Sequence, residues 1–208
     1  MRTPEETLSL LDWKRRVFDL YRNVRAHEDP GAAWSLWRET RDKLFASHEQ
    51  SPIPPEQRSS FAGVPYFDYD PSVRFAVELI QTEPERYDIT SSRDGTYSFT
   101  RFARAPLHVG GKDVELEVYW LEAYGGGVFV PFRDATSGKS TYGAGRYLLD
   151  TVKGADLGEV DGKLVLDFNF AYNPSCSYDD CWACPLAPPP NRLAVPIRAG
   201  ERAGERIA

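Results

Sequence analysis

The sequence predicts an α+β fold that is mainly β: an antiparallel β-barrel or sandwich with an N-terminal pair of helices and an irregular, proline-rich C-terminal tail. Apolar residues recur at three- and four-residue steps over the first fifty positions, as on one face of a helix. Beyond a proline-rich connector the period changes to two. Glycine-containing turns then separate short apolar runs, which is typical of antiparallel strands.

Two helix starts are visible near the N-terminus. Thr3, Pro4 and Glu6 supply a hydroxyl N-cap, a proline at the first helical position and a glutamate three residues after the cap. Asp29 and Pro30 indicate a second start. The apolar stripes are Leu10, Trp13, Val17, Leu20, Tyr21 and Val24 in the first helix, and Trp34, Trp37, Arg41, Leu44 and Phe45 in the second. We expect the two helices to form a hairpin or to lie across a sheet.

The connector and the strands follow in order. Prolines at 52, 54, 55 and 65 break any regular element over residues 51–72. Strands are predicted at Val73–Ile80, Tyr87–Ser91, Tyr97–Phe102, Val114–Trp120 and Val128–Phe132. The turn signals are Asp94-Gly95, Gly110-Gly111 and Gly125–Gly127. Strict alternation from Val114 to Trp120 predicts one buried face and one wet face, with Glu115, Glu117 and Tyr119 on the wet one.

A last long strand is predicted at Lys163–Tyr172, after the turn signal Asp161-Gly162. The proline-rich tail begins at Pro185. We divide the chain into an N-terminal helical pair at 1–50, a connector at 51–72 and an antiparallel β domain with its tail at 73–208. One core should serve all three parts, since the length suits one structural domain overall.

The composition is that of a globular protein, with 41% hydrophobic, 13% aromatic and 27% charged residues. A formal net charge of -6 and a pI near 5.2 give no basic field for phosphate backbones, so we expect no nucleic-acid partner. The N-terminus lacks the layout of a secretory signal, and no run of about 18 apolar residues would span a membrane. We expect a cytoplasmic location and no membrane partner; the oligomeric state is not indicated.

Residues 129–150 raise the hypothesis of a phosphate-binding loop, because Gly-Lys-Ser follows an apolar run there. Such a loop needs an earlier glycine at the position of Arg133, and a helix after the lysine. Residues 141–145, TYGAG, are a poor helix start. The glycines at 143 and 145 also fail as a dinucleotide motif, because Leu148 stands where a third glycine should be. We predict neither nucleotide site, and no cofactor.

Polar residues crowd two neighbouring segments, 134–146 and 167–173. Asp and Asn are disfavoured in strands, so Asp167 and Asn169 should be fixed by hydrogen bonds, either in a buried structural network or in the wall of a pocket. If the chain after Thr141 is extended, Tyr142 and Arg146 share one face. Arg146 should be buried, with its guanidinium facing either an anionic ligand or an internal carboxylate, Asp134 or Asp167.

This pattern favours a protein that binds a small polar or anionic molecule in a pocket lined by Asp134–Arg146 and Asp167–Asn173. The predicted ligand-binding residues are Thr136, Tyr142, Arg146, Asn169, Tyr172 and Asn173. One alternative is a hydrolase that uses Asp134 and Asp167 as a carboxylate pair. A second alternative is a non-enzymatic interaction module that uses the N-terminal helices.

Nucleophilic catalysis has no recognisable motif in the chain. There is no Gly-x-Ser-x-Gly, and His27, His48 and His108 lack a patterned partner. We expect each to be an ordinary surface or packed histidine. His48, which lies near Ser51-Pro52, is retained as the one candidate of interest.

Segments across most of the chain after the helices resemble a known family. FRDATSGKSTYGAGRYL, LDFNFAYNPSCSYDDCWACPLAPPPNRL and the closing IRAGE are similar to signature segments of domain-of-unknown-function family 1684 (DUF1684), a prokaryotic family without an assigned activity. Ser51-Pro52 and residues 61–67 resemble two further segments, with Ile53 in place of the usual leucine. The resemblance implies a shared, mainly β fold and brings no known reaction, cofactor or catalytic residue.

The three cysteines lie close together in the tail. Cys176, Cys181 and Cys184 copy the spacing of the first three ligands of a plant-type iron–sulfur site, but there is no fourth cysteine. Zinc would need a histidine, Asp179 or Asp180 as its fourth ligand, and we predict no metal. In the family pattern the matching positions are 176 and 184. The resemblance therefore favours a structural pair, either buried neighbours or a disulfide in oxidised protein.

Overall fold

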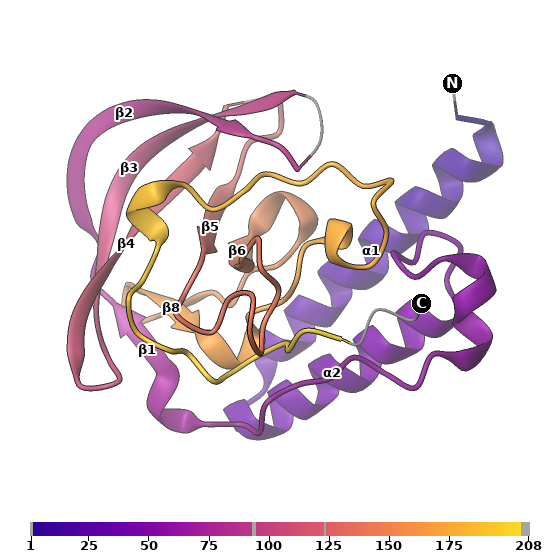
Figure 1. Ribbon diagram of the computed structural model, residues 1–208, viewed down its shortest axis with the longest axis horizontal. Coiled ribbons are helices and arrows are strands. Elements are labelled where there is room, and N and C mark those ends of the chain that lie inside the picture. The colour runs from indigo at the N-terminus through magenta and orange to yellow at the C-terminus, as the bar shows by residue number, and fades with distance from the viewer. Residues whose placement is uncertain (1, 93–94, 123, 205–208) are drawn as a thin grey trace.

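The computed structural model describes residues 2–92, 95–122 and 124–204, and the chain begins with two helices (Figure 1). Helix α1 spans Pro4–Ala26 and helix α2 spans Pro30–Ser47. The Thr3 hydroxyl accepts a hydrogen bond from the Glu6 amide, and the Glu6 carboxylate accepts one from the Thr3 amide. Asp29 caps α2 by accepting a bond from an amide of its first turn. Both predicted helix starts are confirmed.

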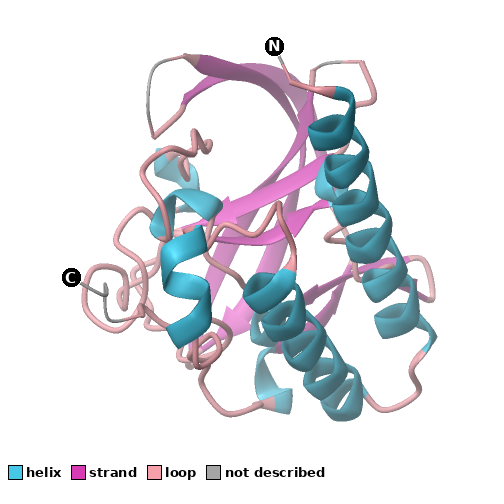
Figure 2. Ribbon diagram, turned by 90° about the vertical axis from the view of Figure 1, so that its right-hand side faces the viewer, coloured by secondary structure: helices cyan, strands magenta, loops and turns pink. Residues whose placement is uncertain are grey.

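The apolar stripes of the helices pack into the core. Trp37 is fully buried, and its indole donates a hydrogen bond of 3.0 Å to the Tyr21 hydroxyl. Its ring centroid lies 5.2 Å from that of Phe170. The Trp34 indole donates to the backbone carbonyl of Asn169 at 2.9 Å. These contacts join the two helices to each other and to residues 169–170, and Figure 2 shows the helices in front of the strands.

Two antiparallel sheets make up the β part of the described chain (Figure 1). The larger has the order β2-β3-β4-β5-β6, with β2 Ile80–Thr90, β3 Thr96–Val109, β4 Lys112–Leu121, β5 Val128–Phe132 and β6 Arg146–Asp150. The smaller has the order β1-β8-β7, with β1 Arg74–Val77, β8 Lys163–Asp167 and β7 Glu159–Val160. Over the described ranges the sheets form an open, sandwich-like arrangement rather than a closed barrel. The predicted fold class is confirmed.

Glycine-containing turns connect the strands as predicted. Gly110 and Gly111, with φ of 60° and 73°, close the β3–β4 hairpin, and left-handed backbone at both positions suits the twist of the strands. Asp161 and Gly162, with φ of 51° and 72°, close the β7–β8 hairpin. Of the other turn signals, Asp94-Gly95 falls between β2 and β3, and Asp94 lies outside the described residues.

Two predicted strands differ from the structure. The run Val73–Ile80 is divided, because β1 pairs with β8 in one sheet while β2 begins the other. The run Lys163–Tyr172 ends as a strand at Asp167, whose carboxylate accepts from the Asn169 amide and starts a 3-10 helix at Phe168–Phe170. The predicted strand position of Asn169 is therefore wrong, because a side-chain cap replaces the next ladder bond.

The predicted wet face of β4 is also wrong. Glu117 and Tyr119 are buried, whereas Trp120 is 44% exposed. A second apolar cluster covers that face of the sheet and includes Tyr119 and Phe129. Within it the Tyr119 hydroxyl donates to Glu117, which also forms an ion pair with Arg101. Glu115 is exposed as predicted, but the cluster buries the other two positions of that face, so alternation alone did not indicate exposure.

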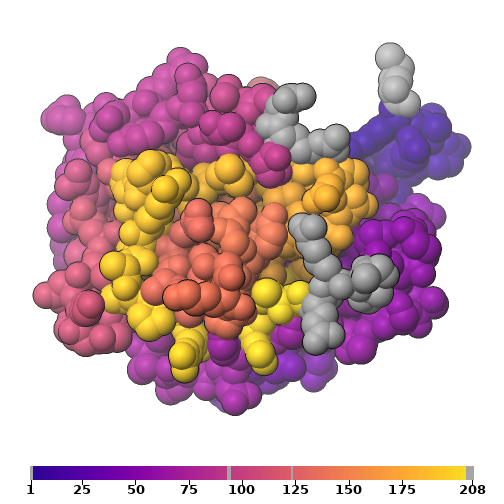
Figure 3. Space-filling view, viewed as in Figure 1, coloured from indigo at the N-terminus to yellow at the C-terminus, as the bar shows by residue number. Residues whose placement is uncertain are grey.

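The C-terminal segment at residues 191–199 is extended and packed, although it is not part of a named strand. From Asn191 to Ala199 every second residue is buried, the others being exposed. Backbone hydrogen bonds join this segment to the loop after β5, including Ala135 to Val195 at 3.1 Å. Figure 3 shows the loop and the tail side by side on one face of the molecule. The tail thus forms part of the surface in which the cleft lies.

Candidate functional site

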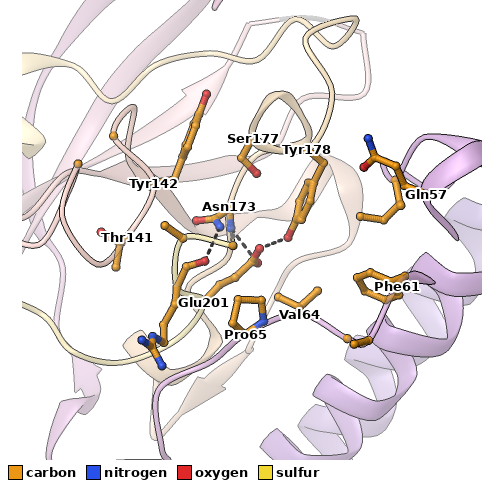
Figure 4. A pocket seen from close by; sticks show the side chains of 18 of the residues that line it. Gln57, Phe61, Val64, Pro65, Thr141, Tyr142, Asn173, Ser177, Tyr178 and Glu201 are labelled. Carbon is orange, nitrogen blue, oxygen red and sulfur yellow. Dashed lines mark hydrogen bonds between the residues drawn. The ribbon is translucent and has the colours of Figure 1, made fainter. Parts of the chain in front are cut away.

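A cleft of about 600 Å³ opens where the tail meets the connector and the loop after β5. Its walls come from four segments that lie within residues 53–65, 138–143, 173–180 and 201–204. A volume of this size suits a small ligand. Figure 4 shows side chains of these segments facing one space.

The connector wall of the cleft is fixed by helix α2. The carboxylate of Asp42 accepts a hydrogen bond of 2.9 Å from the Val64 amide. Gly63, with φ of 106°, precedes Val64, and a Cβ at Gly63 would lie 3.1 Å from the same carboxylate. The Pro65 carbonyl then accepts a bond of 2.8 Å from the Arg202 amide. These bonds place the apolar side chains of residues 61–65 opposite the tail.

The loop wall is built by a turn rather than by an extended strand. The Thr136 carbonyl accepts bonds from several following amides, and the Gly138 amide donates to the Thr141 carbonyl at 2.9 Å. The Ser140 carbonyl accepts from the Ala203 amide at 3.0 Å, which joins this turn to the tail. The Lys139 side chain is exposed at the tip of the turn and lines the cleft.

Glu201 lies beneath the cleft and is fully buried. One carboxylate oxygen accepts from Arg41 at 3.1 Å and from the Asn173 amide at 2.9 Å, and the other accepts from the Tyr178 hydroxyl. Burial raises the pKa of Glu201, and Arg41 opposes that rise. The Arg41 guanidinium also donates to the Tyr66 hydroxyl at 2.5 Å. The carboxylate is therefore fully engaged within the protein.

Two polar atoms in the wall of the cleft have no hydrogen-bond partner among the residues that the structure describes. The Asn173 side chain is 4% exposed, and its Oδ1 has no hydrogen-bond partner among the residues that the structure describes. Ser177 Oγ also has no hydrogen-bond partner among those residues. Both residues line the cleft, and Figure 4 shows Ser177 beside Asn173. Buried polar groups are nearly always hydrogen-bonded, so these two atoms are exceptions among the described residues.

Arg146 is buried and paired with Asp134, as the sequence led us to expect. Its guanidinium lies 3.3 Å from the Asp134 carboxylate, and both side chains are almost fully inaccessible. It also donates to the backbone carbonyls of Ile197, Ala199 and Glu201. Burial lowers the pKa of Arg146, and Asp134 opposes that shift. Arg146 therefore holds the tail to β6 and lies outside the wall of the cleft.

Asp167 and Asn169 belong to a separate buried network. Asp167 Oδ1 accepts from the amide and from Nδ2 of Asn169. The Asn169 side chain also donates to the Asp70 carbonyl and accepts from the Asp70 amide, at 2.8 Å each. Arg74 Nε lies 3.7 Å from Asp167 Oδ2. This network fixes the start of β1 beside the 3-10 helix.

The remaining predicted ligand-binding residues are divided between the cleft and the interior. Tyr142 and Asn173 line the cleft. Thr136 is buried, and its hydroxyl donates to Asp134 at 2.7 Å. Tyr172 lines a smaller cavity of about 100 Å³ near the helices. Because the chain turns at residues 143–144, Tyr142 faces Cys176 and does not share a strand face with Arg146.

Sequence reasoning missed several residues of the cleft, chiefly Lys139, Ser177, Tyr178, Glu201 and Arg202. A signal for some of them was present. Ser177 and Tyr178 lie in the segment NPSCSYDDC, and Glu201 closes IRAGE, both of which resemble family segments. Lys139 belongs to the Gly-Lys-Ser sequence that fails as a phosphate-binding loop. Nothing in the local sequence indicated that these segments meet.

The histidines occupy structural positions. His27 and His48 are the C-caps of α1 and α2, and His108 lies on β3 beside Asp113. His48 Nε2 lies 3.2 Å from Asp12, and its Nδ1 accepts from the Gln50 amide. Among residues 2–92, 95–122 and 124–204, no group of three His, Cys, Asp or Glu side chains is arranged to hold a metal. Over the same ranges, neither helix is apolar enough along its length to cross a membrane.

Comparisons with known proteins add a family and a fold relative. None of the curated proteins matches the chain. A solution NMR structure of the uncharacterised protein from gene locus rrnAC0354 of Haloarcula marismortui is 38% identical, with a TM-score of 0.56. That match covers 79% of this chain and 89% of the other. The model of DUF1684, described as a protein of unknown function, matches residues 59–202. The chain therefore belongs to the DUF1684 family.

Proposed function

We propose that the protein binds a small organic anion that also carries a hydroxyl or ammonium group, and that the cleft is its site. The observation that carries the proposal is the pair of unpartnered atoms, Asn173 Oδ1 and Ser177 Oγ, among the described residues of the wall. Leaving a buried acceptor unsatisfied costs about 1–3 kcal/mol. A ligand that donates a hydrogen bond to such an atom removes this cost.

The orientation of Asn173 supports a donor on the ligand. Its Nδ2 donates to the Arg202 carbonyl at 3.0 Å, and its backbone amide donates to Glu201. Because these bonds fix which side-chain atom is nitrogen, Oδ1 is the side-chain atom left without a partner among the described residues. An oxygen of this kind accepts hydrogen bonds only. The ligand must therefore present an O–H or N–H group at this point.

The charges of the cleft support an anionic group. Lys139 and Arg202 are exposed residues of the wall, and Asp180 is the acidic residue that opposes them. The Glu201 carboxylate adds little negative potential, because Arg41, Asn173 and Tyr178 already engage it. Phe61, Val64 and Pro65 supply an apolar side. A carboxylate or phosphate on a short carbon chain fits this combination.

The Ser177→Ala variant provides the sharpest test. Because Ser177 Oγ has no partner within the described protein, its removal should leave the free energy of unfolding unchanged or slightly raised. Affinity for a ligand that bonds to it should fall by about 1 kcal/mol, or roughly fivefold. Titration calorimetry with glycerol 3-phosphate and with glycerate would measure the affinity, and acetate would serve as an anion without a donor.

Ser47→Ala is the matched control, because Ser47 lies on α2 and its hydroxyl donates to the Lys43 carbonyl away from the cleft. It should leave binding unchanged. A Lys139→Gln variant should weaken the binding of glycerol 3-phosphate and of glycerate. Its free energy of unfolding should not change, since this side chain is exposed. Native mass spectrometry of the purified chain would search for a retained metabolite. Failure of all anions to bind, or equal binding of acetate and glycerate, would count against the proposal.

The two other hypotheses receive less support. Neither Asp134 nor Asp167 is among the described residues that line the cleft, and each belongs to its own internal network. We therefore do not propose a hydrolase. An interaction role for the helices would rest on the exposed residues Leu8, Leu11 and Phe18 of α1, and nothing in the described structure indicates which partner would bind them. A cytoplasmic location remains part of the proposal on sequence grounds.

A further inference from the structure

Cys176 and Cys184 lie together in the apolar cluster behind the cleft. They are 4% and 1% exposed, and neither forms a disulfide in the structure. They belong to the same buried cluster, and each thiol acts on the pKa of the other. Ser92 fixes the second of them, because the Cys184 amide donates to Ser92 Oγ at 3.0 Å and the Ser92 amide donates to the Cys184 carbonyl at 2.7 Å. The fold thus holds the two cysteines in one buried cluster.

The environment favours a thiolate on one of the two residues. The hydrogen bond with Cys184 lowers the pKa of Cys176 to about 6, while burial acts in the opposite direction. The same hydrogen bond raises the pKa of Cys184. The interaction therefore favours ionisation of Cys176 over ionisation of Cys184. The thiolate is the nucleophile in thiol–disulfide exchange, and its neighbour is placed to resolve the product.

The cysteine pair is directly connected to the cleft. The Tyr142 hydroxyl lies 3.4 Å from the Cys176 carbonyl oxygen and 3.8 Å from Cys176 Sγ, and Tyr142 lines the cleft. The segment between the two cysteines carries Ser177, Tyr178 and Asp180, which also line it. A covalent bond between the cysteines would therefore close a ring that contains this part of the wall.

We propose that Cys176 and Cys184 form a reversible disulfide that controls the cleft, with a small disulfide such as oxidised glutathione as the oxidant. Cys176 thiolate attacks one sulfur of the reagent, the reagent S–S bond breaks, and one glutathione thiolate leaves. Cys184 then loses its proton and attacks Cys176 sulfur, displacing the second glutathione. Two protein thiols are oxidised to one disulfide, and the reagent is reduced to two thiols.

Bond formation should change the shape of the wall. A disulfide fixes its two sulfur atoms about 2.05 Å apart, so bond formation draws the backbone at 176 and 184 together. Ser177 is the next residue, so its hydroxyl moves with that backbone. Only this consequence for ligand affinity depends on the proposed function. We expect the oxidised protein to bind glycerol 3-phosphate severalfold more weakly, and dithiothreitol to restore binding.

The disulfide itself is tested without any ligand. The native full chain is incubated with oxidised glutathione at pH 7, its remaining thiols are alkylated, and its peptides are mapped without reduction. We expect a Cys176–Cys184 linkage, with Cys181 alkylated because Cys181 is exposed. Cys181→Ser should give the same linkage. Cys184→Ser should instead keep glutathione on Cys176. Recovery of Cys176 and Cys184 in alkylated form, or a linkage through Cys181, would overturn the proposal.

Oxidation and binding are separate readouts, so the two proposals can fail independently. If the reduced protein binds none of the anions, the proposed function fails while the mapped disulfide still decides the cysteine chemistry. If the reduced protein binds glycerol 3-phosphate and the mapped oxidised form binds it equally, the control of the cleft by the disulfide is rejected.

Discussion

Asp167 shows how one buried carboxyl responds to its surroundings. It is fully buried, and the hydrogen bonds from Asn169 stabilise its ionised form. Arg74 approaches Oδ2 only to 3.7 Å, and that oxygen has no hydrogen-bond partner within the described residues. Desolvation outweighs these contacts and raises the pKa of Asp167 from 3.8 to about 6. A single side chain thereby couples the stability of the protein to pH.

The sign of that coupling leads to a prediction for Asp167→Asn. Between pH 4 and pH 6 the folded protein keeps a proton that the unfolded chain has released, so stability falls as pH rises through this window. Asparagine resembles the protonated carboxyl and does not titrate. Relative to the wild type, the variant should gain up to about 3 kcal/mol in free energy of unfolding from pH 4 to pH 6.5. Urea unfolding at several pH values measures this difference.

Asp161→Asn is the control for the pH series. Asp161 is exposed in the β7–β8 turn with φ of 51°, a backbone conformation that asparagine also adopts. Its stability difference from the wild type should stay constant over the same window. A constant difference for Asp167→Asn as well would show that this carboxyl ionises normally in the folded protein.

At the scale of elements, the sequence correctly predicted features that depend on residues close together in the chain. The start of α1 depends on Thr3 and Glu6, which are three residues apart, and it was predicted correctly. The end of β8 depends on Asn169, whose partners Trp34 and Asp70 lie 135 and 99 residues away. No local pattern distinguishes a strand from a capped 3-10 turn under these conditions. Long-range contacts made that decision.

The candidate site was likewise only partly predictable from the sequence. The buried state of Arg146 and its pairing with Asp134 were predictable, because an arginine among glycines and aromatic residues needs a partner. The position of the cleft was not, since it requires segments near 60, 140, 175 and 202 to meet. The sequence from Asn191 to Ala199 has a period of two, and the structure buries every second residue there. The prolines around this segment nevertheless indicated an irregular tail. Only the assembled fold shows that this tail covers the sheet.

Arg146 at the start of β6 gives the prediction for this scale. Its guanidinium binds Asp134 and three carbonyls of the tail, so Arg146→Ala leaves a buried carboxylate without its charge partner. We expect a loss of about 3–5 kcal/mol in free energy of unfolding. Arg146→Lys should lose part of this, because an ammonium group cannot reach the same set of acceptors.

Arg198→Ala is the matched control, because Arg198 lies in the same tail segment with its side chain exposed. Its free energy of unfolding should change by less than about 0.5 kcal/mol. Denaturant unfolding followed by tryptophan fluorescence would compare the three variants. An Arg146→Ala protein as stable as the wild type would show that the tail is held without this clamp.

At the scale of the whole molecule, Glu201 joins parts of the chain that are distant in sequence. It links α2 through Arg41, the chain after β8 through the Asn173 amide, and the cysteine segment through Tyr178. The Arg41 guanidinium also lies over the rings of Trp37 and Phe45, at 4.6 Å and 4.9 Å from their centroids. This buried ion pair is therefore one of the contacts that join the helices to the tail beneath the cleft.

Removing one partner of this pair should weaken the whole fold. Glu201→Ala leaves the Arg41 guanidinium buried without its carboxylate, and we expect a loss of about 3–5 kcal/mol in free energy of unfolding. The double variant Arg41→Met, Glu201→Ala should lose less than the sum of the single changes, because no charge remains unpaired. Arg22→Ala breaks the exposed pair with Asp19 on α1 and should cost less than about 1 kcal/mol. Helical circular dichroism and tryptophan fluorescence, followed together in urea, would show whether helices and sheets still unfold in one transition. Strict additivity of the Arg41 and Glu201 changes would mean that the two side chains stabilise their own segments independently, and that the helices are held to the tail by apolar contacts instead.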